Sequence, residues 1–444
     1  MKKVLGILFL MSATAFARDL TLDEAIDLSL NNSKKIQISS KNMKIGELNL
    51  GRAFKMALPS VSYEGSYSRF EHTQRNMYGR ETGVNKITNI QDASGKDGKT
   101  RKYLNHEEKG GYTSQIVISQ PIFQGGAILG GIKGAKAQSN IMDLSFVAEK
   151  RDVRIDTIQM YSNIIRYQKD LEALETSKKE LEIRHKEQKN KLDLRLIIKA
   201  DLLKTEVAML EVDSNIVQVK NLIDIEMKRL KIETGLTNET DLKLVDFVVP
   251  ENLSQEINFD KDLITAKTES LDALISKNNV EYAKAEKMVA FSDNLPKVNA
   301  FVQYGGYERE SMDDTFQNEE WRGGVAVSWE LFNFGSGIDN FRAANESYKI
   351  EKLNDSIAQD NIEINLTTAY SEVIRLEKLR VAMRNSLEAS QENYNIDTER
   401  YKAGLLSTQD YLNSEAQLRQ SKVDYNKAET DYLVAFEKYR SLLI

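Results

Sequence analysis

Two long stretches of this 444-residue chain contain neither glycine nor proline. The first covers 100 residues, 135–234, and the second covers 66 residues, 338–403. Glycine and proline are the residues that most often end a helix, so their absence over such lengths predicts very long helices. At a rise of ~1.5 Å per residue, a helix of ~60 residues would extend ~90 Å. The rest of the fold has to be arranged around these helices.

The apolar residues in the first stretch recur in alternating steps of three and four. This 3.5-residue period is that of a coiled-coil seam. Thr205 and Glu226 interrupt the series, which consists of Leu202, Thr205, Met209, Val212, Ile216, Val219, Ile223, Glu226 and Leu230. The period predicts an antiparallel helical hairpin, and on its own it indicates no function.

The second stretch repeats the first at an offset of 209 residues. Tyr161-Ser162-x-x-Ile165-Arg166 recurs as Tyr370-Ser371-x-x-Ile374-Arg375, and Asp201 corresponds to Asp410. The offset carries the seam onto Tyr411, Ser414, Leu418, Ser421, Tyr425, Ala428, Tyr432, Ala435 and Tyr439. The chain therefore consists of two copies of one unit. We predict a first repeat over 18–235, a connecting segment over 236–258 and a second repeat over 259–444.

Each copy contains two segments with a period of two, over 61–69 and 112–122 in the first and over 298–304 and 321–331 in the second. Alternating runs of about ten residues are typical of transmembrane β-strands, although half-buried strands of a soluble sheet alternate in the same way. A capping box, Thr21-x-x-Glu24, begins a helical pattern before the first strand. The sequence of each copy thus predicts a helix, two strands and a long helical hairpin.

The first seventeen residues have the features of a signal peptide. Lys2 and Lys3 precede an apolar run over 4–11, and Ala15-Phe16-Ala17 forms a cleavage site. We therefore expect residues 1–17 to be removed on export. No later stretch approaches 18 apolar residues, so a membrane-spanning part would have to be a β-barrel.

The composition argues against an enzyme or a nucleic-acid-binding protein. The chain has no cysteine, and its three histidines are far apart in the sequence. Charged residues are balanced to a net charge of −6, which leaves no basic face for a phosphate backbone. We found no phosphate loop, metal-ligand cluster or acid/base pair. The sequence therefore predicts no catalytic residue, no cofactor, no metal site and no nucleic-acid partner.

The number of strands predicts an oligomer. The chain supplies four strands, whereas single-chain outer-membrane barrels need at least about eight, and an open sheet edge cannot face lipid. Two copies would give eight strands, and three would give twelve with room for a lumen. Trp321 and Trp329 lie on one strand face. Their vertical separation of ~20 Å approximates the distance between two aromatic girdles in outer-membrane lipid. The long helices would then project from the membrane.

The sequence resembles the TolC family of outer-membrane efflux and secretion ducts along the whole mature chain. The matching motifs are Leu20-Thr21-Leu22-Asp23-Glu24-Ala25-Ile26, Leu58-Pro59, Pro121-Ile122-Phe123-x-Gly125-Gly126, Arg400-Tyr401-x-x-Gly404 and Asp410-x-Leu412. The resemblance implies a homotrimer with a twelve-stranded β-barrel in the outer membrane, continued by a long α-helical coiled-coil tunnel in the periplasm. It also implies an inner-membrane transporter and a periplasmic adaptor as partners, and a duct that conducts substrates passively.

The resemblance assigns roles to the ends of the hairpins, where Asp410 and Asn413 match the positions that line the tunnel aperture. Three Asp410 side chains close together would repel one another and attract cations. Ser407-x-x-Asp410 also fits a helix-capping box, and the two roles are compatible. Asp201 and Tyr401 match positions that tie neighbouring helices together. The arginine of some relatives is Leu406 here, which leaves an Asp201–Tyr401 hydrogen bond as the expected contact.

The two hairpin turns are the expected docking surface for the adaptor. Gly404-Leu405-Leu406-Ser407 resembles the adaptor-facing turn of the family, and the first copy has Arg195-Leu196-Ile197-Ile198 instead. We predict that Leu196, Ile197, Leu405 and Leu406 dock the adaptor beside Gly404, with packing inside the turn region as the alternative.

Two polar segments are predicted loops, and one alternative class of protein shares the long hairpins. The glycine-rich residues 71–111 and the acidic residues 308–320 are expected to be extracellular loops. A periplasmic coiled-coil adaptor or scaffold without a barrel would share the long hairpins. It would carry a single hairpin rather than two, and it would lack the lipid-facing strand patterns.

Overall fold

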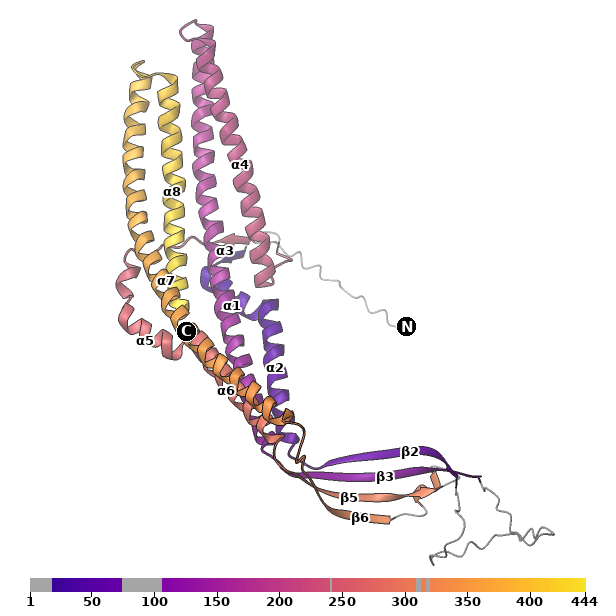
Figure 1. Ribbon diagram of the computed structural model, residues 1–444. Helices are drawn as coiled ribbons and strands as arrows, with labels where there is room; N and C mark the ends of the chain where they lie inside the picture. The colour runs from indigo at the N-terminus through magenta and orange to yellow at the C-terminus, as the bar shows by residue number, and fades with distance from the viewer. Residues whose placement is uncertain (1–17, 74–105, 240–241, 309–312, 317–319) are drawn as a thin grey trace, which may run out of the picture. The chain divides into compact units, whose positions relative to one another are not determined.

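The computed structural model of the protein describes residues 18–73, 106–239, 242–308, 313–316 and 320–444 (Figure 1). The predicted signal peptide lies outside these residues, as do most of the predicted loop over 71–111 and part of the one over 308–320. Contacts divide the chain into two compact units. We call them the helical unit, made of residues 1–50, 133–284 and 345–444, and the sheet unit, made of residues 51–132 and 285–344.

The two halves of the chain have the same order of main elements. The first half contains α1 (Leu22–Asn32), α2 (Lys34–Lys55), β2 (Ser60–Thr73), β3 (His106–Gln124), α3 (Ala127–Asp193) and α4 (Lys199–Thr234). The second contains α5 (Phe259–Glu269), α6 (Leu271–Ser292), β5 (Lys297–Glu308), β6 (Glu320–Ser328), α7 (Ser336–Lys402) and α8 (Thr408–Ser441). Shorter elements are β1 (Arg18–Leu20), β4 (Leu242–Leu244) and the 3-10 helices η1 (Leu253–Glu256) and η2 (Asp313–Phe316).

The helical unit contains two antiparallel hairpins, α3 with α4 and α7 with α8 (Figure 1). Helices α3 and α7 each have 67 residues. The predicted seam is confirmed in α8, where seven of its nine positions are buried, namely Tyr411, Leu418, Ser421, Ala428, Tyr432, Ala435 and Tyr439. In α4 the buried seam positions are Thr205, Val212, Ile216 and Leu230. Among the described residues, no helix combines the length and apolar composition needed to cross a membrane.

Three apolar clusters hold the helical unit together. One, at the ends of the hairpins, contains Leu174, Leu181, Val212, Tyr394, Tyr411 and Leu418. A second joins the segment after β4 and α5 to α7 and α8, and a third surrounds the β1–β4 pair. In the third, the hydroxyl of fully buried Tyr161 lies 2.8 Å from the carbonyl oxygen of Leu20 and 2.7 Å from that of Val245. This parallel pair lies partly inside the segment expected only to connect the repeats.

The sheet unit contains an antiparallel sheet in the order β2-β3-β5-β6. All four predicted strand segments are strands, although β6 ends at Ser328 rather than at residue 331. The register aligns Tyr63, Ile116, Tyr304 and Trp321 across the sheet. A second aligned set is Val61, Ile118 and Val302, so one face of the sheet is apolar.

The opposite face carries small and polar residues. Ser62, Glu64, Gln115 and Gln303 belong to it by the alternation of side chains along each strand. Gln115 donates a hydrogen bond of 2.8 Å to Glu64 on the neighbouring strand. A Cβ atom on Gly305 would lie 2.0 Å from the carbonyl oxygen of Ser114, so close approach of the backbones excludes a side chain there.

The helical pattern before the first strand is interrupted once. The capping box is present, because the Thr21 hydroxyl accepts a hydrogen bond from the Glu24 amide at 3.2 Å. Helix α1 ends at Asn32, and Ser33 adopts an extended conformation with ψ of 127° before α2 begins. The sequence had predicted one continuous helix, because Ser33 is neither glycine nor proline.

Candidate functional site at the hairpin turns

The two hairpin turns have the same backbone hydrogen bonds. The amide of Leu196 donates to the carbonyl of Lys191 at 2.8 Å, and the amide of Leu405 donates to that of Arg400 at 2.9 Å. Each bond spans a residue with positive φ, Arg195 at 58° and Gly404 at 77°. These positions correspond at the offset of 209. A left-handed residue with a Cβ costs ~1–2 kcal/mol, whereas glycine adopts this conformation freely. The first turn is therefore the more strained.

Of the four apolar turn residues in the predicted docking set, two are exposed. Leu196 is 69% exposed and Leu405 is 78% exposed. Ile197 and Leu406 are half-buried, and Leu406 packs against the apolar cluster of Tyr394 and Tyr411. Two exposed residues that sequence reasoning missed, Leu194 and Ile198, flank the first turn.

Ser407 caps the N-terminus of α8, and Asp410 in the first turn is its hydrogen-bond partner. The Asp410 backbone amide donates to the Ser407 hydroxyl at 3.1 Å, and that hydroxyl donates to the Asp410 carboxylate at 2.7 Å. Asn413 accepts a hydrogen bond from Gln409 at 3.0 Å. Asp410 and Asn413 line a groove of about 310 Å³ together with Asp397. Within one chain, the contacts of Asp410 therefore fit the predicted helix-capping box, and the aperture role stays a prediction.

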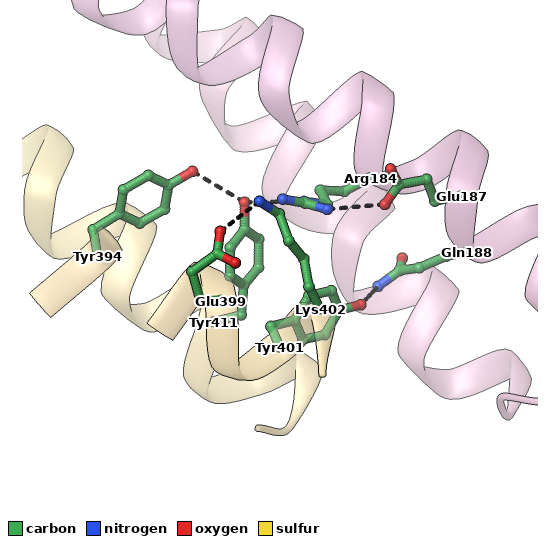
Figure 2. Close-up of polar contacts among 8 residues, drawn as sticks. All are labelled: Arg184, Glu187, Gln188, Tyr394, Glu399, Tyr401, Lys402 and Tyr411. Atoms are coloured by element: carbon green, nitrogen blue, oxygen red, sulfur yellow. Dashed lines mark hydrogen bonds and ion pairs between the residues drawn. The ribbon is translucent and has the colours of Figure 1, made fainter. Parts of the chain in front are cut away.

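Asp201 and Tyr401 make separate contacts. The Tyr401 hydroxyl accepts a hydrogen bond from Gln188 Nε2 at 2.8 Å (Figure 2). The Asp201 carboxylate lies 3.6 Å from Lys204 Nζ, one turn further along α4. Tyr401 thus ties α7 to α3 through Gln188, and within one chain the expected bond to Asp201 is replaced by this contact.

Tyr401 belongs to a cluster that we call the arginine–tyrosine cluster, made of Arg184, Gln188, Tyr394, Tyr401 and Tyr411 (Figure 2). The rings of Tyr401 and Tyr411 stack with centroids 4.8 Å apart. The guanidinium carbon of Arg184 lies 5.3 Å from the Tyr411 centroid and 5.9 Å from the Tyr401 centroid. Arg184 also donates to the Tyr411 hydroxyl at 3.4 Å and to Glu187 at 2.9 Å.

Burial strengthens the contacts of this cluster. Tyr411 and Tyr394 are buried, and their hydroxyls lie 3.0 Å apart. Burial, and then the hydrogen bond that the Tyr394 hydroxyl donates to Glu180, raise the pKa of Tyr394, so it stays protonated. A cation–π contact contributes ~0.5–2 kcal/mol and rises within that range as water is excluded. The seam marked Tyr411 as a buried position, but nothing in the sequence marked Arg184.

Two further carboxylates lie in the interface between α3 and α8. Glu415 accepts hydrogen bonds from Ser177 and, at 3.0 Å, from Arg419. Asp170 accepts one from Asn426 at 2.8 Å. Desolvation raises the pKa of both carboxyl groups. This interface is therefore more polar than a coiled-coil seam predicts.

The two tryptophans lie on or beside the last strand of the sheet. Trp321 is on β6, exposed, with its ring centroid 4.6 Å from that of Tyr304. Trp329 lies one residue beyond β6, is also exposed, and donates to the carbonyl of Asn294 at 3.2 Å. The described residues contain no group of three or more histidine, aspartate or glutamate side chains that could hold a metal ion.

Comparisons with known proteins relate the chain to outer-membrane efflux proteins. Residues 265–443 match the family described as outer membrane efflux protein. The matched residues lie in the second repeat and make up 179 of the 444 residues of the chain. The prediction made from the sequence motifs is thereby confirmed. The family and the structural neighbours are outer-membrane channels that extend into the periplasm, which agrees with the location predicted from the sequence. No curated protein is a significant sequence match.

Solved structures of outer-membrane channels share the fold. CmeC of Campylobacter jejuni is 17% identical with a TM-score of 0.76, covering 95% of this chain and 85% of its own. VceC of Vibrio cholerae is 13% identical with a TM-score of 0.73, covering 95% of each chain. The open state of MtrE of Neisseria gonorrhoeae is 13% identical with a TM-score of 0.71, covering 95% and 88%.

Proposed function

We propose that this efflux protein is the outer-membrane exit duct of a tripartite efflux or type I secretion system. In this proposal three copies form a twelve-stranded barrel continued by a helical tunnel. A periplasmic adaptor and an inner-membrane transporter deliver the substrates, and the duct conducts them passively without catalysis. The single observation that carries the proposal is that one chain leaves both its sheet and its helices incomplete.

The sheet supports closure with other copies. Its outer strands are β2 and β6, and among the described residues each is paired on one side only. In lipid, every unpaired backbone group would cost several kcal/mol. The apolar face exposes Val61, Tyr63, Trp321, Val325 and Val327. A barrel closed by three sheets would pair these edges and turn this face toward lipid.

Aromatic residues lie at both ends of the apolar face. Tyr63, Tyr304 and Trp321 are at one level of the register. Trp329, Phe332 and Phe334 follow the other end of β6, and all three are exposed. Aromatic side chains prefer the two membrane interfaces. This arrangement supports the proposal that Trp321 and Trp329 belong to two girdles.

The helices support the same stoichiometry. Helix α4 has an exposed apolar stripe on the face opposite its buried seam, consisting of Leu203, Val207, Leu210, Val217, Ile225 and Ile232. Helix α7 exposes a second stripe, consisting of Ile350, Leu353, Ile357 and Ile364. Apolar stripes of this length are stable when another helix covers them. We propose that α4 of one copy packs against a neighbouring copy.

The hairpin turns supply the other roles of the duct. Leu194, Leu196, Ile198 and Leu405 are the side chains available to dock an adaptor. Ile197 and Leu406 would support them from beneath, beside Gly404. In a trimer, three copies of Asp410 and Asn413 would line the aperture, while Asp410 also pairs with Ser407, the residue that caps α8. Asp201 of one copy is the proposed interhelical contact for a neighbouring copy.

Channel recording tests the proposal. The purified protein, reconstituted into planar lipid bilayers, should give discrete conductance steps. A periplasmic adaptor or scaffold without a barrel would give none, and it would stay in solution without detergent. Absence of conductance from protein that inserts into vesicles would overturn the proposal.

A further inference from the structure

The four long helices of the helical unit lie in a row in which α8 and α3 are the inner pair (Figure 1). Helices α7 and α4 are at the two sides, and both have exposed apolar stripes. The contact between α3 and α8 joins the first repeat to the second. Since α7 is the repeat equivalent of α3, and α4 is that of α8, an equivalent contact can form between α7 of one copy and α4 of the next.

Three pairs of side chains join α3 to α8 at different positions along the helices. They are Ser177 with Glu415, Asp170 with Asn426, and Arg154 with Glu437. At the offset of 209 residues, their equivalents are Ser386, Leu379 and Glu363 on α7 and Glu206, Val217 and Lys228 on α4. The inferred pairs between copies are therefore Ser386 with Glu206, Leu379 with Val217, and Glu363 with Lys228.

The first pair is the same in both repeats. Ser386 and Glu206 repeat the serine and the glutamate of α3 and α8, so a serine hydroxyl can again donate to a carboxylate. Glu206 contacts His185 Nε2 at 3.0 Å within the chain, yet 44% of its side chain remains exposed. A carboxylate has several acceptor positions, so Glu206 can accept a second hydrogen bond from a neighbouring copy.

The second pair changes from polar to apolar. On α3 and α8 it is a hydrogen bond of 2.8 Å from Asn426 to Asp170. On α7 and α4 it becomes Leu379, which is half-buried, and Val217, which is 60% exposed. Val217 of another copy placed against Asp170 would leave a buried carboxylate without its amide partner, which is costly. The second pair therefore distinguishes α4 from α8.

The third pair keeps opposite charges but exchanges them between the helices. Arg154 of α3 lies 3.1 Å from Glu437 of α8. In the equivalent pair, α7 carries the acid, Glu363, and α4 carries the base, Lys228, which is exposed. Glu363 binds Lys267 of α5 within the chain, and 49% of its side chain remains exposed. Like charges would meet if α8 took the place of α4 beside α7, or if α4 took the place of α8 beside α3.

We propose that these pairs determine which helices meet when copies of the chain assemble. The charged pair and the apolar pair admit α4 of a neighbouring copy beside α7 and disfavour α8 in the same place. First and second repeats therefore alternate around the assembly. The inference rests on the proposed function and deepens it, because it names the surface that receives α4 in the proposed trimer.

Cross-linking between copies tests the predicted alignment. The chain has no cysteine, so Glu206→Cys combined with Ser386→Cys introduces the only two thiols. A short bifunctional thiol reagent applied to outer membranes should convert this variant to covalent trimers on a denaturing gel. In the matched control, Asp213→Cys with Ser386→Cys, the thiol on α4 is ~10 Å further along the helix. Cross-linking of the control should be at least about tenfold slower.

Reversal of the charged pair tests the selectivity. Lys228→Glu places two acids together in each interface, so light scattering should show trimers dissociating at a roughly fivefold higher protein concentration in detergent. Glu363→Lys added to this variant restores opposite charges and should restore the dissociation of the wild type. High salt should reduce the difference between Lys228→Glu and the wild type, since salt screens exposed charges.

The outcomes distinguish the helix pairing from the proposed function. A trimer in which Glu206→Cys with Ser386→Cys cross-links no faster than the control would overturn the pairing and leave the duct in place. Failure of Glu363→Lys to rescue Lys228→Glu would do the same. A wild type that is monomeric in detergent would overturn both the pairing and the proposed function.

Discussion

Helices α4 and α8 occupy equivalent places in the two repeats, yet α4 is much more exposed than α8. Helix α8 buries thirteen residues and is capped by Ser407. Helix α4 buries five, and Ile198 at its N-terminus makes no side-chain capping bond. Its outer face carries an exposed apolar stripe instead. The same helical framework is therefore well covered in one repeat, and in the other it leaves an apolar face that the proposed trimer would cover.

The two hairpin turns also differ, because the turn of the first repeat is more strained than that of the second. Gly404 takes its positive φ without strain, whereas Arg195 takes the equivalent conformation with a side chain. Arg184, Tyr394 and Tyr401 surround Tyr411 in the first turn of α8. No comparable cluster is found around the described residues of α4. The second hairpin thus makes more contacts within the chain, whereas the first leaves more of its surface for the proposed assembly.

Charges on the outer face of α4 should have the largest effect. Leu210→Asp combined with Val217→Asp would place two carboxylates in each proposed interface between copies. Burial of a leucine or valine contributes ~1.5–3 kcal/mol, and three interfaces multiply the loss. We expect no trimer, measured by light scattering in detergent. The control Asn215→Asp, which adds a charge away from the stripe, should leave the trimer intact. A double variant with the same mass as this control would contradict the proposed interface.

Charges at the turns should abolish export but not assembly. Leu196→Asp combined with Leu405→Asp alters the two most exposed turn residues of the predicted docking set. Central apolar contacts contribute ~2 kcal/mol or more each, so affinity for the adaptor should fall about thirtyfold for one change and about a thousandfold for both. Pull-down of the adaptor and drug susceptibility of cells measure this. Lys199→Gln is the matched surface control, and export at the wild-type level in the double variant would remove the docking role.

Asp170→Asn should change how stability depends on pH. Desolvation raises the pKa of Asp170 above its ordinary value of 3.8, so the folded state binds the proton more tightly than the unfolded state. Its contribution to stability is therefore greatest at low pH and is lost as pH rises from that value through the folded pKa. The variant should lose this slope and be more stable at neutral pH. Urea unfolding at several pH values measures both effects, and an unchanged slope would argue against the assignment.

The turn residues should give the smallest effects, with opposite signs. Arg195→Gly relieves a strained φ and should stabilise the protein by about 0.5–1 kcal/mol, after allowing for the flexibility of glycine in the unfolded chain. Gly404→Ala should destabilise it by about 1 kcal/mol. Thermal unfolding followed by circular dichroism is the measurement. Shifts of the same sign would show that the two turns are not equivalent.

Periodic features could be predicted from the sequence, because a single period reports which face is buried. The strands and the heptad seams of α4 and α8 were found in this way. The break at Ser33 and the pairing of β1 with β4 were not, since neither depends on a repeated pattern. Tyr161 holds that strand pair through contacts with residues 141 and 84 positions away.

The arginine–tyrosine cluster shows the same limit at the site. Arg184 lies among many charged residues of α3, and its partner Tyr411 is 227 positions away. Exposed Leu196 and Leu405 could be predicted because turn residues of a helical hairpin face outward. The difference between them and Ile197 or Leu406 depends on packing, which the sequence alone does not describe.

Native mass spectrometry of the protein extracted from outer membranes tests the central claim most directly. We expect a complex with the mass of three chains in detergent, and boiling should convert it to single chains. A single chain that remains dissolved after the detergent is removed would contradict it.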